Sequence, residues 1–495
     1  MPSIIMPFIS KSKFLWGLQC QKLLWHAYNA KNLIPEPDAS QQAIFDQGHE
    51  VGALAKLLFP GGIEVGQGIV DIETVLQLSE KTIKQRRPLF EAAFAFDGGY
   101  ARVDILNPVE EDSWDIIEVK SSTSVKDVYL PDLAFQCFVY SGAGLKIRRC
   151  FVLHINSDYV RHGDIDPRQL FKKVNVTAQV SDLSRQIEMQ LGEMSKIIRL
   201  KESPEVPIGK HCDTPYECPL HDHCWKFLPA DNPLTLYRGK EKGFKLLAAG
   251  ITQLGKIPEN VPLNDKQIIQ RDVARTGQPH ISKRAIKEFL AQLEFPLYFL
   301  DFETIGTAIP LFDNTSPFQQ IPFQFSLHVQ PSPGGKTKHL SYLTQGRNDP
   351  RREFLEELRN VMGEVGTVIA YNAPFEKGVL DASAEIHTQF KPWVQQIKRR
   401  VVDLLIPFRA FRYYHPQQHG SASIKSVLPA ITGRSYKDLE IQEGGTASRE
   451  FLRVTFSDVA KAEREKVRSQ LEIYCGQDTE GMVWIVDELR NLVES

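Results

Sequence analysis

The chain of 495 residues has no segment with the length and composition of a membrane anchor or an export signal. No stretch approaches the roughly 18 uninterrupted apolar residues that a membrane-spanning helix needs. The first residues, MPSIIMPFISKSKF, lack a charged region followed by a long apolar run, so we expect no signal peptide. These absences predict a cytoplasmic protein without a membrane partner, in a compartment where thiols stay reduced.

An excess of charge of either sign is also missing. The 59 Lys and Arg residues nearly balance the 61 Asp and Glu residues, which gives a formal net charge of -2. A strongly basic chain would indicate a nucleic-acid partner. The balance leaves that question open, because acidic metal sites and basic grooves cancel in the sum.

Repeats of fixed period are absent as well, which excludes a repeat architecture. The GGKT segment at 334–337 superficially resembles a phosphate-binding loop, but Gln330 stands where that loop needs its first glycine. We therefore interpret the segment as a hairpin turn.

What the chain does contain is ordinary globular material, with 42% hydrophobic and 24% charged residues. A chain of this length is too long for one hydrophobic core, so we expect more than one domain. The pattern of helical and strand-like segments predicts an α/β protein. We expect a domain over residues 1–228, a helical connector over 229–290 and a second domain over 291–495.

Short strands and amphipathic helices occur in both predicted domains. In the first, helical spacing over 11–58 precedes the strands, and an Asp97-Gly98-Gly99 turn predicts a hairpin. The other predicted elements of the first domain are strands at 89–96, 100–107, 114–120 and 147–156 and helices at 128–142 and 178–201. Those of the second are strands at 297–302, 321–330, 337–344 and 367–371 and helices at 351–362 and 458–493.

Acidic residues and a lysine follow two neighbouring strands of the first domain. Asp104 lies near the end of one, and Glu118 and Lys120 lie two residues apart on the next, in WDIIEVKSST. Side chains alternate along a strand, so Glu118 and Lys120 share one face. Two carboxylates can hold a hard cation such as Mg²⁺ or Mn²⁺, which activates water and neutralises charge on a phosphodiester. The lysine can position the nucleophile or stabilise a developing oxyanion.

Three further polar residues accompany this group. His49, in FDQGHEVG, offers an imidazole that could complete the metal shell, and Gln136 and Tyr140 lie one helical turn apart. Each feature has an ordinary structural alternative. Glu and Lys also alternate on the exposed faces of edge strands, and a single histidine is more often structural. The pattern alone leaves both interpretations open.

Three of the seven cysteines fall within one short segment, HCDTPYECPLHDHCW, at Cys212, Cys218 and Cys224. Thiolates bind zinc or iron–sulfur clusters, and four ligands close a structural site. The candidates for the fourth ligand are His221, His223 and Cys20. Of these, Cys20 in KFLWGLQCQKLLW is attractive because it would tie the N-terminus to this segment. The cysteines that we expect in hydrophobic cores are Cys137, Cys150 and Cys475.

The order of these residues resembles the iron–sulfur branch of the RecB-type PD-(D/E)XK nucleases, which includes CRISPR-associated RecB-like exonucleases and the nuclease domains of AddB-type helicase–nucleases. The resemblance covers about residues 8–227. The ligands that it implies for a [4Fe–4S] cluster are Cys20, Cys212, Cys218 and Cys224. The ligands that it implies for Mg²⁺ or Mn²⁺ are His49, Asp104 and Glu118, with Lys120 catalytic.

The same resemblance implies that Gln136 and Tyr140 support the site and touch DNA. One departure concerns the cysteines, because some relatives place the first two of the trailing three closer together than this chain does. Zinc therefore stays an alternative to the iron–sulfur cluster.

A second acidic group is divided between distant parts of the second domain. LYFLDFETIG places Asp301 and Glu303 on one face at the end of a hydrophobic strand, and EIYCGQDTEG places Tyr474 and Asp478 on one face of a helix. Glu376, in VIAYNAPFEKGVL, falls at a strand-to-helix junction between them. Clustered carboxylates repel each other unless cations hold them, and two divalent cations can clamp the attacking water and the leaving oxygen of a phosphodiester. A helix cap and chance spacing are the structural alternatives.

This second group resembles the tyrosine variant of the DEDD exonucleases on the ribonuclease H-like fold, over about residues 295–490. The metal ligands that it implies are Asp301, Glu303 and Asp478. The further catalytic residues that it implies are Glu376 and Tyr474. Where that family has Asp, this chain has Glu376, so either the longer carboxylate reaches the metal or the site is impaired, and Asp403 is a fallback carboxylate.

The whole layout resembles an uncharacterised bacterial family of predicted RecB-family nucleases. It implies a restriction-endonuclease-like domain with a four-cysteine cluster, followed by a ribonuclease H-like domain. The expected function is a metal-dependent nuclease with a nucleic-acid partner, preferably a DNA exonuclease. Two alternatives remain open: a nucleic-acid-binding module with inactive sites and a structural cluster, and a small zinc-binding interaction protein with coincidental acidic motifs.

Overall fold

The computed structural model describes residues 8–69, 71–110 and 112–494. Strands and helices mix throughout, which confirms the predicted α/β class, and the chain divides into two compact units. Unit 1 comprises Met1–Lys226 and Thr307–Phe318, and unit 2 comprises Phe227–Gly306 and Gln319–Ser495. The residues that we expected to form a connector thus belong to unit 2.

Unit 1 is built on a six-stranded sheet with the order β2-β3-β6-β7-β8-β9. Its strands are β2 (Ile63–Glu64), β3 (Leu89–Phe90), β6 (Ile105–Pro108), β7 (Ser113–Lys120), β8 (Lys146–Ile155) and β9 (Phe171–Asn175). The long strands β7 and β8 run parallel, whereas β6 and β9 are antiparallel to their neighbours. A smaller sheet contains β1 (Ile9–Ser10), β5 (Gly99–Arg102) and β4 (Ala93–Phe96).

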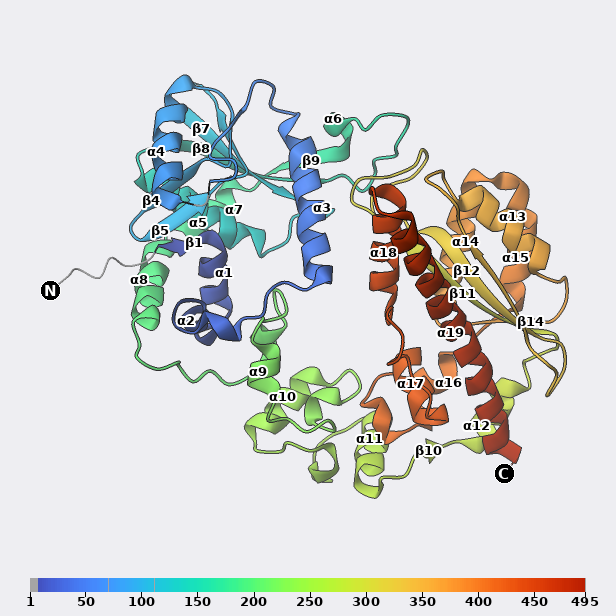
Figure 1. Cartoon of the computed structure of the whole chain (residues 1–495). Helices are drawn as coiled ribbons and strands as arrows, with labels where there is room; N and C mark the ends of the chain where they lie inside the picture. The colour runs from blue at the N-terminus through green and yellow to red at the C-terminus, as the bar shows by residue number, and fades with distance from the viewer. Residues whose placement is uncertain (1–7, 70, 111, 495) are drawn as a thin grey trace. The chain divides into compact units, whose positions relative to one another are not determined.

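Side chains of β7 alternate between two hydrophobic cores on opposite faces of the sheet. The helices of unit 1 are α1 (Lys11–Gln19), α2 (Gln21–Asn29), α3 (Ala39–Lys56), α4 (Ile72–Thr82), α5 (Tyr129–Gly142), α6 (Pro167–Leu170), α7 (Thr177–Ser184), α8 (Ile187–Ile198) and α9 (His221–Trp225) (Figure 1). Ile116 belongs to the core that contains Phe135 of α5, and Ile117 belongs to the core that contains Val51 of α3. Glu118 therefore shares the α5 face with Ile116.

The predicted hairpin is present, but it bends from one sheet into the other. Its turn has positive φ at Asp97 and Gly98, 47° and 76°, as tight two-residue hairpin turns require. Near the turn β4 pairs with β5, and beyond it β3 pairs with β6 in the larger sheet. Each arm is thus two strands rather than one, and Glu91 and Asp104 lie at the two breaks.

Residues 307–318 follow the first strand of the unit 2 sheet, yet they pack within unit 1. Ala308 is fully buried in the core of unit 1 that α3 covers. The guanidinium of Arg161 donates to the carbonyl oxygens of Pro310 and Leu311, at 2.9 and 2.7 Å. The sequence assigned this segment to the second domain by continuity, and the structure corrects that assignment.

Unit 2 is built on a five-stranded mixed sheet with the order β13-β12-β11-β14-β15. Its strands are β11 (Leu297–Ile305), β12 (Ile321–Gln330), β13 (Lys338–Leu343), β14 (Thr367–Ala370) and β15 (Val401–Asp403). The strands β13, β12 and β11 are antiparallel, whereas β11, β14 and β15 run parallel. A two-stranded ladder pairs β10 (His280–Ile281) with β16 (Tyr413–Tyr414).

Helices cover both faces of this sheet. The helices of unit 2 are α10 (Lys240–Ala248), α11 (Asp265–Thr276), α12 (Lys283–Leu290), α13 (Arg351–Val361), α14 (Pro374–Ile386), α15 (Lys391–Arg400), α16 (Ile406–Arg409), α17 (Ile424–Thr432), α18 (Gly444–Phe456) and α19 (Lys461–Glu494). Leu300 and Phe302 of β11 pack in the core with Phe354 of α13. The alternate residues Asp301 and Glu303 point to the other face, which α19 crosses (Figure 1).

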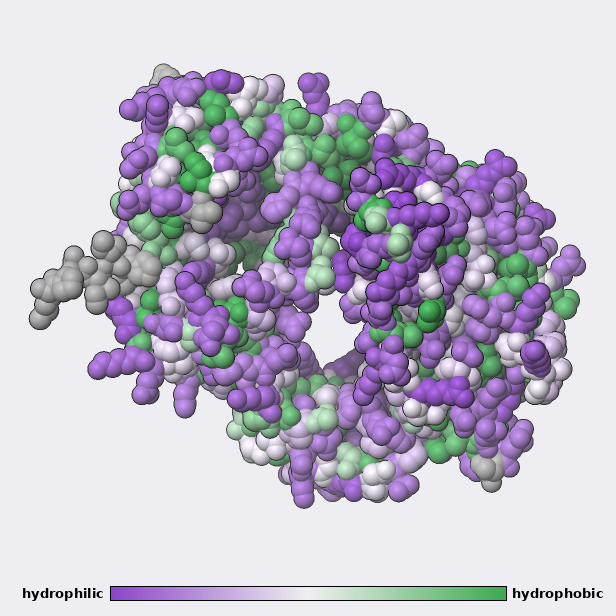
Figure 2. All heavy atoms as spheres, in the orientation of Figure 1, coloured by the Kyte–Doolittle hydropathy of each residue, from purple (hydrophilic) through white to green (hydrophobic). Residues whose placement is uncertain are grey.

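The surface of the described residues is mixed in polarity. In Figure 2 hydrophilic residues cover most of the visible face of both units, and hydrophobic residues form smaller groups between them. Among the described residues, no helix combines the length and the apolar character needed to cross a bilayer.

One helical prediction was too long, because residues 178–201 form α7 and α8 with a break between them.

Phe354 is the best probe of the unit 2 core, because its ring meets Phe302 and Phe325 edge-to-face at 5.0 and 5.6 Å. We expect Phe354→Ala to reduce the free energy of unfolding by about 3–5 kcal/mol, through lost burial and the cavity left behind. Val365→Ala, at a site that is 68% exposed, is the control and should change it by less than about 0.5 kcal/mol. Scanning calorimetry of the full chain measures both, and equal shifts would contradict this packing.

Candidate functional site

Glu118 is the centre of the acidic group in unit 1. It lies near the end of β7, and its buried carboxylate accepts three hydrogen bonds. Lys11 Nζ and Lys120 Nζ both donate to Oε1, at 2.8 and 2.7 Å, and Gln136 Nε2 donates to Oε2 at 2.8 Å. The structure therefore brings Glu118, Lys120 and Gln136 together, as the sequence predicts, and adds Lys11, which it does not predict.

Asp132 is a third carboxylate of this group, which we did not predict from the sequence. Gln136 Nε2 also donates to Asp132 Oδ1, at 2.8 Å. Lys120 Nζ lies 3.2 Å from Asp132 Oδ2, and Lys11 Nζ lies 3.6 Å from Oδ1. The spacing of Asp132 and Gln136, one helical turn apart, was a usable signal for this pair. Nothing local points to Lys11, which is 107 residues from Glu118.

Asp104 completes the group from the break between β5 and β6. Its Oδ2 accepts the backbone N–H of Val119 at 2.7 Å, which turns it toward the end of β7. Burial and the negative charge of Glu118 raise the pKa of Asp104 to about 7. Burial acts in the same direction on Glu118, but the ammonium groups of Lys11 and Lys120 hold the pKa of Glu118 well below its usual range.

His49 is exposed on α3, and among the described residues no hydrogen bond or ion pair links it to Asp104 or Glu118. Its predicted role as a third metal ligand stays a prediction. The direction in which a helical residue points depends on how the helix packs, which the sequence pattern does not contain.

Gln136 and Tyr140 are fully buried, so the predicted contact of these side chains with DNA is wrong for this conformation. Their supporting role fits the geometry. The Tyr140 hydroxyl donates to the carbonyl oxygen of Ala92 at 2.5 Å and accepts the N–H of Val103 at 3.0 Å. These two bonds hold the arms of the bent hairpin together beside Asp104.

The four thiols of the predicted cluster line one narrow pocket in unit 1. The residues are Cys20 between α1 and α2, Cys212, Cys218, and Cys224 on α9. Burial raises the pKa of the Cys218 thiol to about 11, and the neighbouring thiols act in the same direction. Such a group of thiols becomes thiolate readily only when a metal binds it. The donor set therefore fits a thiolate-bound metal group.

Zinc and an iron–sulfur cluster require different spacings of the four sulfur atoms. Four thiolates around one zinc ion, each about 2.3 Å from the metal, have sulfur atoms less than about 4 Å apart. Among the described residues, the group of three or more ligands with all ligand atoms within 4.8 Å of one another is Asp301, Glu303 and Cys475, so the four thiols form no such group. Which metal group the four thiols bind therefore stays a prediction.

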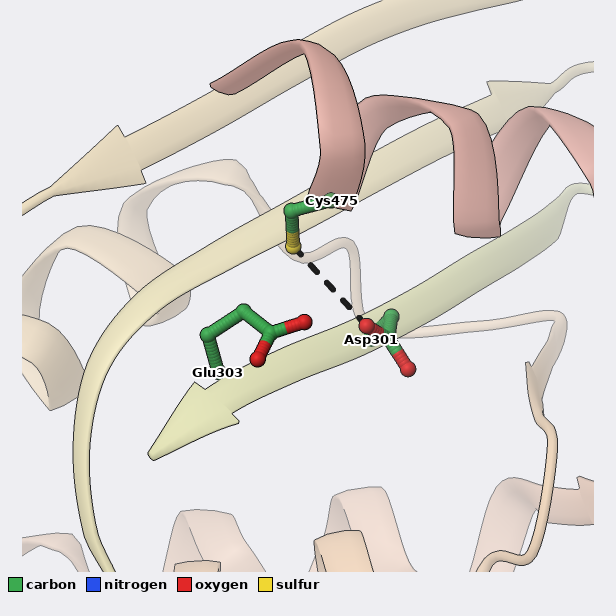
Figure 3. Close-up of side chains that lie close together, drawn as sticks. All are labelled: Asp301, Glu303 and Cys475. Carbon is green, nitrogen blue, oxygen red and sulfur yellow. Dashed lines mark hydrogen bonds between the residues drawn. The ribbon is translucent and has the colours of Figure 1, made fainter. Parts of the chain in front are cut away.

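In unit 2 the structure brings the predicted acidic residues to one cavity of about 480 Å³. The predicted residues that line it are Asp301, Glu303, Glu376, Tyr474 and Asp478. Figure 3 shows Asp301 and Glu303 side by side on β11, beneath the helix that carries Cys475. Tyr474 and Asp478 lie one turn apart on that helix, α19, and Glu376 lies in the first turn of α14.

The carboxylates in this cavity repel one another. Burial and the charges of Asp478 and Glu303 raise the pKa of Asp301 well above its usual value. Burial and Asp478 raise the pKa of Glu303 to about 8, and burial raises the pKa of Glu376 to about 8. Crowded acids of this kind are stable either as protonated groups or beside a cation.

One buried atom in the cavity has no partner. Glu376 is 4% exposed, and its Oε2 makes no hydrogen bond to a described residue. A buried carboxylate oxygen without a donor is costly, and a cation that binds from the cavity would compensate it. Oxygen donors are what Mg²⁺ and Mn²⁺ prefer, so these residues fit a hard divalent cation.

Three neighbours of this site were missed. The Tyr436 hydroxyl donates to Asp478 Oδ1 at 2.6 Å, and Lys425 lines the cavity. The thiol of Cys475, expected only as a core residue, is buried as predicted but also donates to Asp301 Oδ2 at 3.8 Å. Asp403, the fallback carboxylate, instead accepts the backbone N–H of Asn372 at 2.9 Å and so fixes the turn after β14.

Comparison with known proteins gives relatives without an assigned activity. Residues 298–423 match a family model described as a domain of unknown function, DUF2779. The uncharacterized protein MG366 of Mycoplasma genitalium is 28% identical over 219 residues, which are 40% of this chain and 32% of that protein. The uncharacterized protein UU173 of Ureaplasma parvum is 24% identical over 233 residues, or 43% and 34% of the two chains.

The chain spans about a third of the length of these curated relatives. Among solved structures, that of SSO0001 is 14% identical, covers 44% of this chain and 97% of its own, and has a TM-score of 0.17. A likeness with so low a TM-score carries no argument about the fold.

Tyr140→Phe tests whether Tyr140 supports the acidic group of unit 1. Removing the hydroxyl removes its bonds to Ala92 and Val103, whose backbone groups stay paired with each other at 3.1 Å, so we expect a loss of about 0.5–1.5 kcal/mol in the free energy of unfolding. The matched control is Tyr100→Phe on β5, whose hydroxyl forms no hydrogen bond with a described residue. Urea unfolding of the full chain measures both, and a Tyr140→Phe variant as stable as the control would contradict the supporting role.

Proposed function

We propose that this protein is a divalent-metal-dependent nuclease that hydrolyses phosphodiester bonds in nucleic acid, preferably as a DNA exonuclease. The observation that supports this most strongly is the cavity of unit 2. Residues from β11, α14 and α19, up to 177 positions apart from Asp301 to Asp478, present carboxylates to one space. Carboxylates around a cavity are the arrangement that metal-assisted phosphodiester hydrolysis needs.

The acidic residues of the unit 2 cavity and three neighbours each have a role in this proposal. Asp301, Glu303 and Asp478 would hold the metal, and Glu376 would add a ligand through its unpartnered oxygen. A bound divalent cation supplies a polarised water and a positive charge beside the scissile phosphate. Three neighbours would orient these ligands. Tyr436 donates to Asp478, and Cys475 donates to Asp301. Tyr474 lies on the cavity wall.

Lys425 offers a positive charge to the substrate. It lines the same cavity, and its ammonium lies 5.4 Å from the ring centre of Tyr474. A lysine in that position can hold a phosphate group close to the carboxylates. The five-stranded mixed sheet is compatible with our assignment of unit 2 to the ribonuclease H-like fold.

Unit 1 would be a second nuclease site, of restriction-endonuclease-like type. Asp104 and Glu118 would hold a metal, and Lys120 would stabilise charge on the phosphate. One observation favours the alternative function for this unit. Both oxygens of Glu118 already accept hydrogen bonds, and His49 is exposed, so the unit 1 site could bind nucleic acid without cleaving it.

The thiols of unit 1 would hold a [4Fe–4S] cluster. The ligands in this proposal are Cys20, Cys212, Cys218 and Cys224. Gln19 Nε2 donates to the carbonyl oxygens of His211 and Tyr216, both at 2.7 Å, which fastens α1 to the cysteine-rich segment. The cluster would thus join the N-terminal helices to a segment about 190 residues later, where the structure provides little hydrophobic core.

A nuclease assay with separate variants tests the enzymatic proposal. We expect the wild-type chain with Mn²⁺ to cleave labelled DNA, and Asp301→Asn to lower the rate of unit 2 cleavage about 100-fold or more because a metal ligand is lost. Glu118→Gln should remove whatever cleavage unit 1 contributes. The matched control is Glu472→Gln, an exposed residue of α19 close to Tyr474, which should leave the rate unchanged.

Single-stranded DNA, double-stranded DNA and RNA should be compared in that assay. If Asp301→Asn and Glu118→Gln both cleave at the wild-type rate, neither acidic group is a nuclease site. If Glu118→Gln alone has no effect, unit 1 is the binding module of the alternative.

The colour and metal content of the purified protein test the cluster. We expect anaerobically purified protein to be brown and to contain four iron atoms per chain. Cys218→Ser should lower the iron content, whereas Cys137→Ser, on α5 outside the thiol pocket, should not. A colourless protein with one zinc ion per chain would instead favour the zinc alternative.

A further inference from the structure

Two lysines share one carboxylate oxygen in unit 1. The ammonium groups of Lys11 and Lys120 lie 2.8 and 2.7 Å from the same Oε1 of Glu118. Both also lie near Asp132, at 3.6 and 3.2 Å. One ammonium group balances the charge of one carboxylate. The second ammonium group beside Glu118 is therefore explained by further negative charge nearby.

That further negative charge comes from three carboxylates packed against two lysines. Lys11 and Lys120 each form ion pairs with both Glu118 and Asp132, and the N–H of Val119 holds Asp104 toward the same end of β7. Three carboxylates thus face two ammonium groups, which leaves a demand for one more positive charge. A divalent cation meets that demand as well as a lysine does, and it prefers the same oxygen atoms.

Lys11 reaches this site from outside the sheet. It is the first residue of α1, and the other end of α1 is held by Gln19 and Cys20 at the thiol pocket. The backbone of Lys11 is therefore fixed, while its long side chain is 24% exposed, about as much as the 22% of Lys120. Rotation of that side chain alone would take its ammonium out of the site.

Lys120 is less able to leave. It lies on β7 beside Glu118, its ammonium stays 3.2 Å from Asp132, and it lies over the ring of Tyr129 at 5.1 Å. The ammonium of Lys11 lies 2.8 Å from Glu118 but 3.6 Å from Asp132, so its only short contact of the two is with Glu118. Of the two ammonium groups, that of Lys11 is therefore the one that can give way.

We propose that Lys11 is an internal counter-ion of the unit 1 carboxylates, which occupies Glu118 when no divalent cation is bound and swings out when one binds. This inference rests on the proposed metal site of unit 1. Lys11 is then a positioning residue. It keeps Glu118 and Asp132 in place in the metal-free protein, and it sets how much metal is needed to fill the site.

The affinity for Mn²⁺ tests this role without any need for cleavage. The full chain carrying Asp301→Asn and Asp478→Asn serves as the background, so that unit 2 does not contribute to binding. Isothermal titration with Mn²⁺ then compares this chain with the same chain carrying Lys11→Met. Because a positive charge that competes for Glu118 has been removed, we expect the dissociation constant to fall at least about tenfold.

Two further variants separate charge from packing, and a third is a substitute for Lys11→Met. Lys11→Arg keeps the positive charge and should bind Mn²⁺ as the background does. Lys13→Met removes a lysine of the same helix whose ammonium lies over the ring of Tyr28, and it should have no effect. Lys11→Gln repeats the test if the methionine variant does not fold.

The outcomes distinguish the inference from the proposed function. If the background chain binds Mn²⁺ and Lys11→Met and Lys11→Gln bind it equally or more weakly, Lys11 is not a competing counter-ion and the inference fails. If neither the background nor any Lys11 variant binds Mn²⁺, the unit 1 metal site itself is wrong, and the inference falls with it.

Discussion

The repulsion between carboxylates that are crowded together away from water is the constraint on which both sites depend. Each such group must be compensated by a cation or become protonated. In unit 1 the protein supplies the compensation itself, because Lys11 and Lys120 both bind Glu118. In unit 2 the cavity holds four carboxylates, and Lys425 is the basic side chain that lines it. The unit 2 site is therefore the one whose chemistry is incomplete without an external cation.

The rest of each unit serves to hold these acids against their repulsion. In both units, the central carboxylates lie on a strand that is buried on its two faces. Because side chains alternate along a strand, residues next to the carboxylates in sequence point into the hydrophobic core on the opposite face. Phe302 packs under α13 while Asp301 and Glu303 face α19. Ile116 packs under α5 in line with Glu118. Helices that pack against these cores bring the remaining acidic residues to the sites.

Local sequence patterns predict part of the geometry of the two acidic sites. The pairs Asp301 and Glu303 on a strand, and Tyr474 and Asp478 on a helix, are fixed by the periods of those elements, so their shared faces follow from the sequence. The bend at Asp104 could not be predicted, because it arises where two sheets compete for one hairpin. The place of Lys11 could not be predicted either, since its partner is 107 residues away.

Contacts between distant parts of the chain also limit what the sequence predicts about longer segments. Residues 307–318 pack in unit 1 although the strands on both sides belong to unit 2, and no composition change marks the crossing. His49 has the right chemistry in the right order but is exposed on α3, because order along the chain does not fix the direction of a side chain. The four thiols do line one pocket, as the sequence predicts, although Cys20 is far in the chain from the other three.

The central claim is that acidic side chains distant in the chain converge to bind a divalent cation. Crystals grown with Mn²⁺ and measured at the manganese absorption edge test it most directly. An anomalous peak within bonding distance of Asp301, Glu303 and Asp478 is the predicted result. A peak elsewhere in the protein, with those three carboxylates unoccupied at saturating Mn²⁺, would contradict the claim.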